Sequence, residues 1–209
     1  MSVTTEARST VRILLRWAPT FAAFPVGGLA AQLVVGPVTT VGAAAVGGLV
    51  TGAAIGVAQW WALRPTRPSG GWALRPTRSS GGWALRPTGL SAARWVLASA
   101  LGLAAALALA TAVAGPPATL GALLAQGAAC GFGLGAAQAG VLFGRLGTRA
   151  LLWPVLLACA WALGWAVTAA VGVRIEDGWT VFGSTGALVV TALTAVLPLA
   201  LRRAASRGR

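Results

Sequence analysis

The sequence has no histidine, no tyrosine and no lysine, and it has only three acidic residues. Without histidine, a serine–histidine pair cannot form, and a metal site lacks its commonest nitrogen ligand. The acidic residues are Glu6, Glu176 and Asp177, and none of them lies inside a long apolar run. Proton relays and ion sites built from carboxylates within a membrane are therefore excluded. We expect a protein that is not an enzyme and that uses no metal and no cofactor.

Cysteine is also scarce, because the chain contains only Cys130 and Cys159. Both lie in apolar runs. We therefore expect two small buried side chains rather than a disulfide or a pair of metal ligands.

Charged residues make up 9% of the chain and hydrophobic residues 57%, and the mean hydropathy is +0.80. Soluble domains carry about 25% charged residues, and roughly half of their residues must still face water. The composition therefore predicts an integral membrane protein. Its net charge of +13 would suggest nucleic acid in a soluble protein, but here it indicates which side of a membrane the loops occupy. We expect membrane lipids as partners, including anionic headgroups, and no nucleic acid.

Continuous apolar runs of about 20 residues are long enough to cross a bilayer as helices. They do not alternate as the strands of a barrel would. The expected spans are 17–35, 38–63, 94–114, 118–143, 150–172 and 180–201. The basic start before the first run leaves open a signal peptide cleaved near Gly28-Leu29-Ala30. The length of that run and the spans that follow favour a membrane helix instead.

The predicted fold is an all-α membrane protein with six transmembrane helices, arranged as three helical hairpins. Its predicted parts are a cytoplasmic N-terminal segment (1–16), a first hairpin (17–63), a basic loop (64–93), a second hairpin (94–143), a third hairpin (150–201) and a basic cytoplasmic tail (202–209).

Arginine is distributed on one side of this arrangement. Fifteen of the sixteen arginines lie in the N-terminal segment, the basic loop and helix start after it, the loop after the fourth span, and the tail. The remaining one, Arg174, is outweighed by Glu176 and Asp177. Because cytoplasmic loops carry the excess of basic residues, we expect a multi-pass protein of the cell membrane with both termini cytoplasmic. The expected aromatic belt at the interfaces is formed by Trp17, Trp60, Trp61, Trp95, Trp153 and Trp179.

The basic loop contains a unit of eleven residues written three times, starting at Trp61, Trp72 and Trp83. One interpretation is a tandem duplication tolerated in a surface loop, because loop closure entropy grows slowly with length. A second is a patch for anionic lipid headgroups, and a third is a docking segment in polyproline form. The candidate headgroup residues are Arg64, Arg67, Arg75, Arg78, Arg86 and Arg94.

Residues 36–63 align without a gap on 115–142, with eleven identities in 28 positions. The Gly36-Pro37 turn and Gln59 recur as Gly115-Pro116 and Gln138, which a shared richness in glycine and alanine does not easily explain. The second hairpin therefore looks like a copy of the first. The third hairpin shares the topology but lacks the glycines and the glutamine.

Two rows of glycines with a spacing of four residues line one face of the second and of the fourth span. They are Gly48, Gly52 and Gly56, and Gly127, Gly131 and Gly135. Small residues let helix backbones approach closely in lipid, so we expect close helix packing. The alternative is a groove for lipid or substrate.

Gln59 and Gln138 follow the glycine rows by about one turn. An amide within a membrane needs hydrogen-bond partners. We interpret both residues as contributors to packing or anchoring, and the alternative is a polar site formed by the pair.

The motif G-x-x-x-G-x-x-Q-W-x-x-L-R resembles a pattern that is repeated in small polytopic bacterial membrane proteins without an assigned function. It is formed here by Gly52, Gly56, Gln59, Trp60, Leu63 and Arg64. The resemblance covers roughly residues 40–140, and the second copy departs from it at Ala139 and Phe143. It implies a polytopic fold and no activity.

Together these features predict an integral membrane protein with a non-enzymatic, structural or accessory role. The alternative is a small transporter or a lipid-handling protein that uses the glycine-lined helix interface.

Overall fold

The structure is a computed structural model that describes residues 3–64, 91–172 and 181–207. These residues form helices and no strands, which confirms the predicted all-α class. The elements are α1 (Val3–Trp17), the 3-10 helix η1 (Ala18–Ala22), α2 (Ala23–Val35), α3 (Val41–Leu63), α4 (Ala92–Ala114), α5 (Leu120–Leu146), the 3-10 helix η2 (Gly147–Leu151), α6 (Leu152–Ala170), α7 (Ser184–Thr194) and α8 (Val196–Arg207). Most of the basic loop and Trp179 lie outside the described residues.

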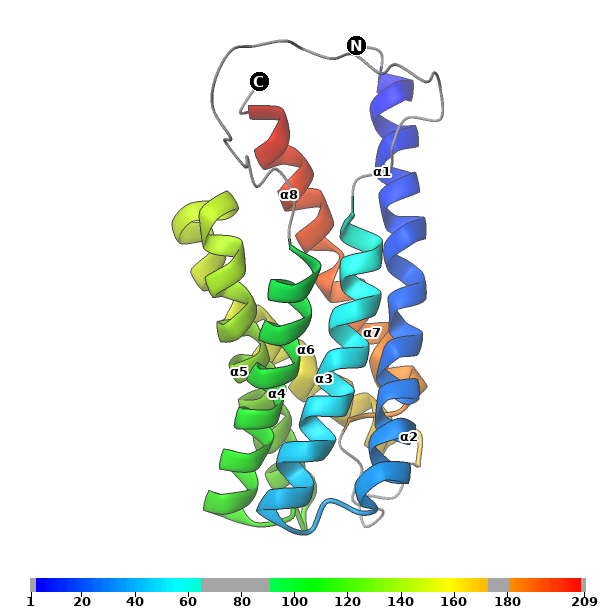
Figure 1. Ribbon diagram of the computed structural model, residues 1–209. Helices are drawn as coiled ribbons and strands as arrows, with labels where there is room; N and C mark the ends of the chain where they lie inside the picture. The colour runs from blue at the N-terminus through cyan, green and yellow to red at the C-terminus, as the bar shows by residue number, and fades with distance from the viewer. Residues whose placement is uncertain (1–2, 65–90, 173–180, 208–209) are drawn as a thin grey trace, which may run out of the picture.

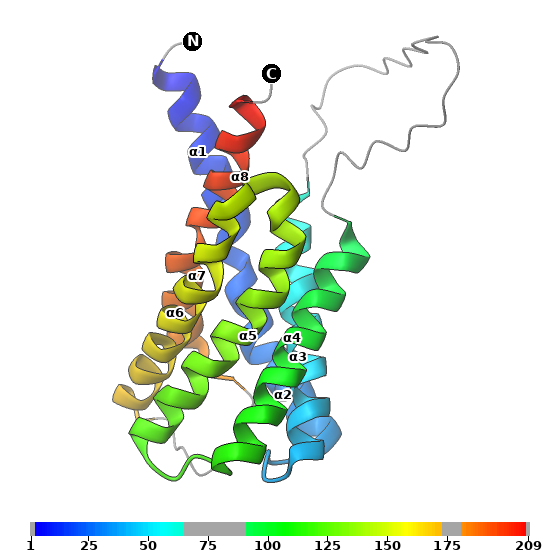
Figure 2. The same ribbon diagram turned by 90° about the vertical axis from the view of Figure 1, so that its left-hand side faces the viewer.

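Five helical segments of the described chain are long and apolar enough to cross a membrane. They are Thr10–Val35, Val41–Leu63, Ala92–Ala114, Leu120–Ala170 and Ser184–Ala205. This finding fits the predicted membrane class, because a helix satisfies its own backbone hydrogen bonds in hydrocarbon. The fourth segment has 51 residues and folds back on itself, so that α5 and α6 lie side by side (Figure 2).

The helices form a closed ring. Each of α2, α3, α4, α5 and α6 packs against the helix that follows it in this order, and α7 packs against η1 and α2 at the start of the chain (Figure 1). The ring therefore gives every member one inward stripe and one outward stripe. Leucines and valines on the outward stripes are exposed, as expected for helices that face lipid.

Short polar caps and glycine turns set the helix ends. Thr40 and Thr119 precede α3 and α5, and each hydroxyl oxygen accepts a hydrogen bond from a backbone N–H three residues later, at 3.2 Å. Gly36 and Gly115 end α2 and α4 with φ angles of 68° and 72°. Both glycines precede proline, which cannot continue a helix. These two turns lie at the same end of the bundle (Figure 1).

Two helical segments differ in their bounds from the predicted spans. The first span was expected to start at 17, but the helix already begins at Val3 and passes through η1, which contains Pro19. The last span was expected at 180–201, but α7 begins at Ser184 and gives way to α8 after Thr194. Pro198 has no N–H to donate to the Thr194 carbonyl four residues earlier, so the helix breaks there.

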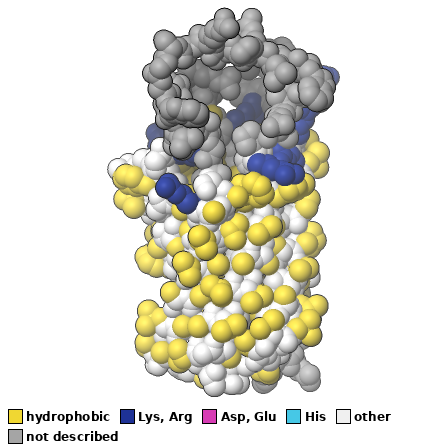
Figure 3. Space-filling model, viewed as in Figure 1, with side chains coloured by type: hydrophobic (Ala, Val, Ile, Leu, Met, Phe, Trp, Pro, Cys, Tyr) yellow, Lys and Arg dark blue, Asp and Glu magenta, His cyan; other side chains and the backbone are white. Residues whose placement is uncertain are grey.

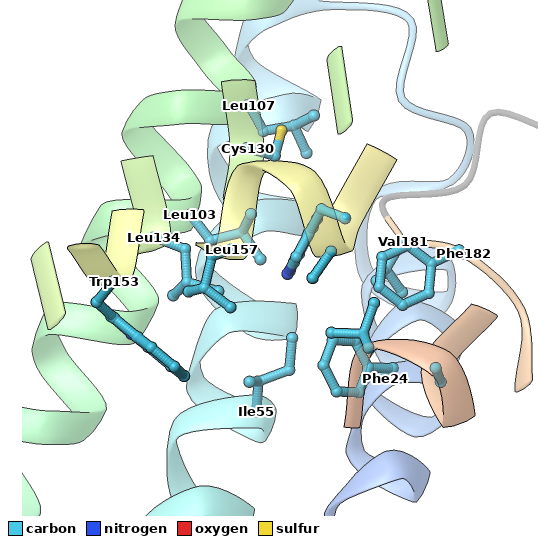
Figure 4. Close-up of a cluster of buried hydrophobic side chains, with 14 of the residues drawn as sticks. Phe24, Ile55, Leu103, Leu107, Cys130, Leu134, Trp153, Leu157, Val181 and Phe182 are labelled. Atoms are coloured by element: carbon cyan, nitrogen blue, oxygen red, sulfur yellow. The ribbon is translucent and has the colours of Figure 1, made fainter. Parts of the chain in front are cut away.

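Aromatic rings fill part of the interior of the ring (Figure 4). Phe24 of α2 stacks on Phe182 with ring centroids 5.2 Å apart, and Trp161 of α6 meets Phe182 edge-on at 5.1 Å. These contacts join the first and last parts of the described chain. The ring is thus closed by side-chain packing as well as by helix contact.

Two expectations about single residues are wrong. Trp17, Trp95 and Trp153 do not belong to an interfacial belt, because their exposed fractions are 1%, 0% and 5%. Trp95 and Trp153 lie in the first turns of α4 and α6, Trp17 is the last residue of α1, and all three are buried in the bundle. Cys159 is exposed, whereas Cys130 is buried as expected, because α6 turns Cys159 to its outer face.

Arginine side chains gather at one end of the molecule. On the face drawn in Figure 3, the basic groups lie near the end that carries both termini, and apolar side chains cover the body below them. The described arginines belong to α1, the adjoining ends of α3 and α4, the end of α5 with η2, and α8.

Candidate functional site

The first glycine row brings α3 into backbone contact with α4. A Cβ atom added at Gly48 would lie 2.8 Å from the Cα atom of Ala104, and one at Gly52 would collide with the carbonyl oxygen of Ser99. At Gly56 it would lie 2.9 Å from the Cβ atom of Ser99. Only glycine permits this approach, so the row faces the first helix of the next hairpin and not its own partner α2.

The second glycine row makes the same kind of contact between α5 and α6. A Cβ atom at Gly131 would collide with the carbonyl oxygen of Leu157, and one at Gly135 would lie 2.6 Å from the Cα atom of Pro154. At Gly127 it would collide with the ring of Trp165. Neither row leaves space for a groove along its interface.

The two interfaces correspond residue by residue. Gly52 of α3 meets Ser99 of α4, and Gly131 of α5 meets Leu157 of α6. The second contact follows from the first when 79 is added to the residue number of the glycine and 58 to that of its partner. The same two shifts relate the contact of Gly56 with Val96 to that of Gly135 with Pro154. The helix α6 therefore occupies the place relative to α5 that α4 occupies relative to α3.

The two glutamines meet in the interior. Gln138 Nε2 donates to Gln59 Oε1 at 3.0 Å and to the Ser99 hydroxyl oxygen at 2.9 Å. Trp153 Nε1 donates to Gln138 Oε1 at 2.7 Å, and the Ser99 hydroxyl donates to the Trp95 carbonyl at 2.9 Å. Gln59 and Gln138 are 3% and 0% exposed. We call Gln59, Ser99, Gln138 and Trp153 the amide cluster.

The amide cluster contains only neutral hydrogen-bonding groups. Neither an amide, a hydroxyl nor an indole titrates near neutral pH, so the cluster offers no general base and no nucleophile activated by one. Gln138 uses its Nε2 as a donor twice and its Oε1 as an acceptor, all toward other members of the cluster. The arrangement joins α3, α4, α5 and α6 and is suited to holding helices together.

The predicted headgroup arginines are placed only in part. Arg64 follows the last residue of α3, and its guanidinium lies over the rings of Trp60 and Trp61. Arg94 lies in the exposed first turn of α4. The other four, Arg67, Arg75, Arg78 and Arg86, lie outside the described residues.

Arg16 has a role that sequence reasoning missed. Its guanidinium donates to the carbonyl oxygens of Trp61 and Arg64, at 2.9 and 3.1 Å. These carbonyls lie at the C-terminal end of α3, where a helix carries partial negative charge. The contact ties α1 to α3.

No pattern in the sequence groups Ser99 and Trp153 with the two glutamines. Serine in an apolar helix often bonds to its own backbone, as Ser99 does, and tryptophan near a span end suggests a lipid interface. Only the register of α4 and α6 against the glycine rows brings both residues to Gln138.

Compared with known proteins, the chain matches no family model, no curated protein and no solved structure. The geometry of the described residues is thus the basis for a functional proposal.

We expect alanine at Gly52 or Gly131 to destabilise the protein by a similar amount. Each new Cβ collides with a backbone carbonyl of the facing helix, and overpacking costs about 1–3 kcal/mol. The control is Gly140→Ala, because Gly140 is exposed on α5 and its Cβ would meet nothing within 4 Å. Thermal midpoints in detergent measure the effect. Unchanged midpoints for both row variants would mean that the rows are not contact sites.

We expect Gln138→Leu to cost more stability than Gln59→Leu. The first change removes three hydrogen bonds and leaves the Trp153 N–H unpaired, whereas the second removes one. An unsatisfied buried group costs about 1–3 kcal/mol. Gln32→Leu is the control, since the buried Oε1 of Gln32 has no partner among the described residues. Equal midpoints for Gln138→Leu and this control would contradict a stabilising role for the cluster.

Proposed function

We propose that this chain is a non-enzymatic integral membrane protein with a structural or accessory role, built as a static bundle. The observation that carries the proposal is the closure of both glycine interfaces by backbone contact. A static bundle has no need for a polar path between its helices. The buried polar side chains of the described residues are one serine, two glutamines and six threonines, and the glutamines and the serine bond to one another.

The alternative role, as a small transporter or lipid-handling protein at the glycine-lined interface, requires that interface to open. Opening α3 from α4 would separate backbones in van der Waals contact and expose Ser99 and Gln59 to lipid or water. The contacts of Gly52 and Gly131 do not favour such an opening. The structural or accessory role is therefore better supported than transport or lipid handling.

We infer six membrane crossings. The 51-residue segment Leu120–Ala170 is far longer than the roughly 20 residues that one crossing needs. Since α5 and α6 pack side by side and are joined by η2, each of them is proposed to cross the membrane separately. The segments Thr10–Val35 and Ser184–Ala205 are each proposed to cross once.

We propose that the arginine-rich end, with both termini, faces the cytoplasm. The arginine distribution of the sequence supports this orientation. Arg64 and Arg94 at this end are proposed to contact anionic lipid headgroups. The resemblance to small polytopic bacterial membrane proteins remains a prediction.

We also infer that the hairpins arose by duplication. Gly27 of α2 contacts Ala54 of α3, and the residues 79 positions later, Ala106 of α4 and Gly133 of α5, are also in contact. The glycine lies on the first helix in one pair and on the second helix in the other. The match of the α5–α6 interface to the α3–α4 interface extends the relation to the third hairpin.

Cysteine labelling tests the number of crossings. In a background with Cys130→Ala and Cys159→Ala, single cysteines replace Ala118, Thr148 or Val171, which are all exposed. Six crossings predict that a membrane-impermeant maleimide labels positions 118 and 171 on intact cells, and position 148 only after permeabilisation. If 118 and 171 were labelled from opposite sides, the segment between them would cross an odd number of times and the proposal would fail.

Water access distinguishes the static bundle from a transporter. In the same background, single cysteines replace Thr51 or Thr168, which are 0% and 1% exposed. A charged methanethiosulfonate reagent should leave both unmodified in native membranes, because it reacts with thiols that reach water. The cysteine at 148 serves as the reactive control in open vesicles. Modification of either core position would favour the transporter.

A further inference from the structure

A cavity of about 640 Å³ opens at the arginine-rich end of the bundle. Three elements line it: the last turns of α5, the η2–α6 junction, and α8. The volume lies in the range of about 300–1,000 Å³ that is typical of ligand pockets. It is separate from the glycine interfaces and from the six arginines predicted to contact headgroups.

Chain reversal at Gly147 creates one side of this cavity. Gly147 has a φ of 57° and ends α5, and η2 then leads directly into α6. Arg145 and Arg149, on either side of this turn, both reach the cavity lining. The opposite side is α8, which begins at Val196, after the break at Ala195, and packs against α1 and α5.

Three arginines, Arg145, Arg149 and Arg203, belong to the lining. Among the described residues, the lining includes no carboxylate. Arg145 and Arg149 place two positive charges beside one space, where they repel each other, and an anion placed between them relieves that repulsion. Arginine is also the side chain that best matches phosphate oxygens, through paired N–H groups.

The rest of the cavity is apolar. Leu142 and Trp153 are among its buried lining residues, and the indole N–H of Trp153 is already donated to Gln138. Leu152 also lines the cavity and is 69% exposed, and its neighbour Leu151 is 61% exposed. The cavity therefore adjoins an apolar outer surface of the kind that faces hydrocarbon.

We propose that this cavity binds one anionic phospholipid, with its phosphate between the arginines and an acyl chain along the leucines. Basic pockets between transmembrane helices on the cytoplasmic side are suited to such headgroups. A soluble phosphate compound would use the charges but leave the apolar walls unfilled, and a zwitterionic lipid would use the walls but not the net charge. Only an anionic lipid matches both features.

Lipid titration followed by native mass spectrometry tests the proposal on the full chain in detergent. The probes are dioleoylphosphatidylglycerol, dioleoylphosphatidylcholine and glycerol phosphate. We expect the first to bind in a one-to-one complex and the other two to bind far more weakly. Each basic residue near an anionic headgroup strengthens binding about fivefold, so Arg145→Gln with Arg149→Gln should weaken it about thirtyfold.

The matched control is Arg8→Gln with Arg12→Gln, which removes the same charge from exposed positions on α1, outside the cavity lining. This control should bind like the unmodified protein. Ala200→Trp fills the cavity wall without changing charge, so it should also weaken binding, and it decides the question if the double arginine variant fails to fold. Equal binding of phosphatidylcholine, full competition by glycerol phosphate, or unchanged binding in Ala200→Trp would overturn the proposal.

Discussion

Direct contact between helix backbones at the glycine rows is the constraint on which the rest of this structure depends. Lipid is as apolar as the helix surfaces, so burial of leucine against leucine provides no driving force within a bilayer. Close approach adds dispersion contacts instead, and it requires that Gly52 and Gly131 carry no side chain. The approach of α3 to α4 and of α5 to α6 then fixes the order of helices around the ring.

The amide cluster is a consequence of this approach. Ser99 reaches Gln138 because Gly52 and Gly56 bring α4 against α3, and Trp153 reaches the same amide because Gly135 brings α6 against α5. One glutamine of α5 thus connects to α3, α4 and α6. A hydrogen bond between membrane helices contributes only about 0.6 kcal/mol on average. Dispersion contacts therefore hold the helices together, and the amide cluster specifies the register of one helix against the next.

Sequence reasoning predicted the helical class, the approximate bounds of the four middle spans and the existence of two glycine rows. Periodicity and composition contain this information, because they are local properties of each span. The partners of the rows are not local. A face of glycines indicates that another helix comes close, but the facing helix α4 or α6 has no matching motif, since backbone atoms of Ser99 or Leu157 make the contact.

The burial of Trp17, Trp95 and Trp153 could not be predicted from the sequence for a related reason. Their positions near span ends are typical of interfacial residues, but an indole can equally pack inside a bundle if its N–H finds an acceptor. Trp17 donates to the Thr191 carbonyl at 3.0 Å, and Trp153 donates to Gln138. Neither acceptor can be inferred from the sequence, because each lies on a helix whose place in the ring depends on tertiary packing.

The two glycine interfaces match in their backbone contacts but not in every side-chain partner. The shifts that relate the two glycine interfaces also relate Gln59 and Trp95 to Gln138 and Trp153. By this correspondence, Trp95 would be expected to donate to Gln59 as Trp153 does to Gln138. Instead Gln59 Oε1 accepts from Gln138, and Trp95 Nε1 is buried without a partner among the described residues. The two interfaces differ at this point, because Gln59 Oε1 accepts from the corresponding amide of Gln138 and not from Trp95.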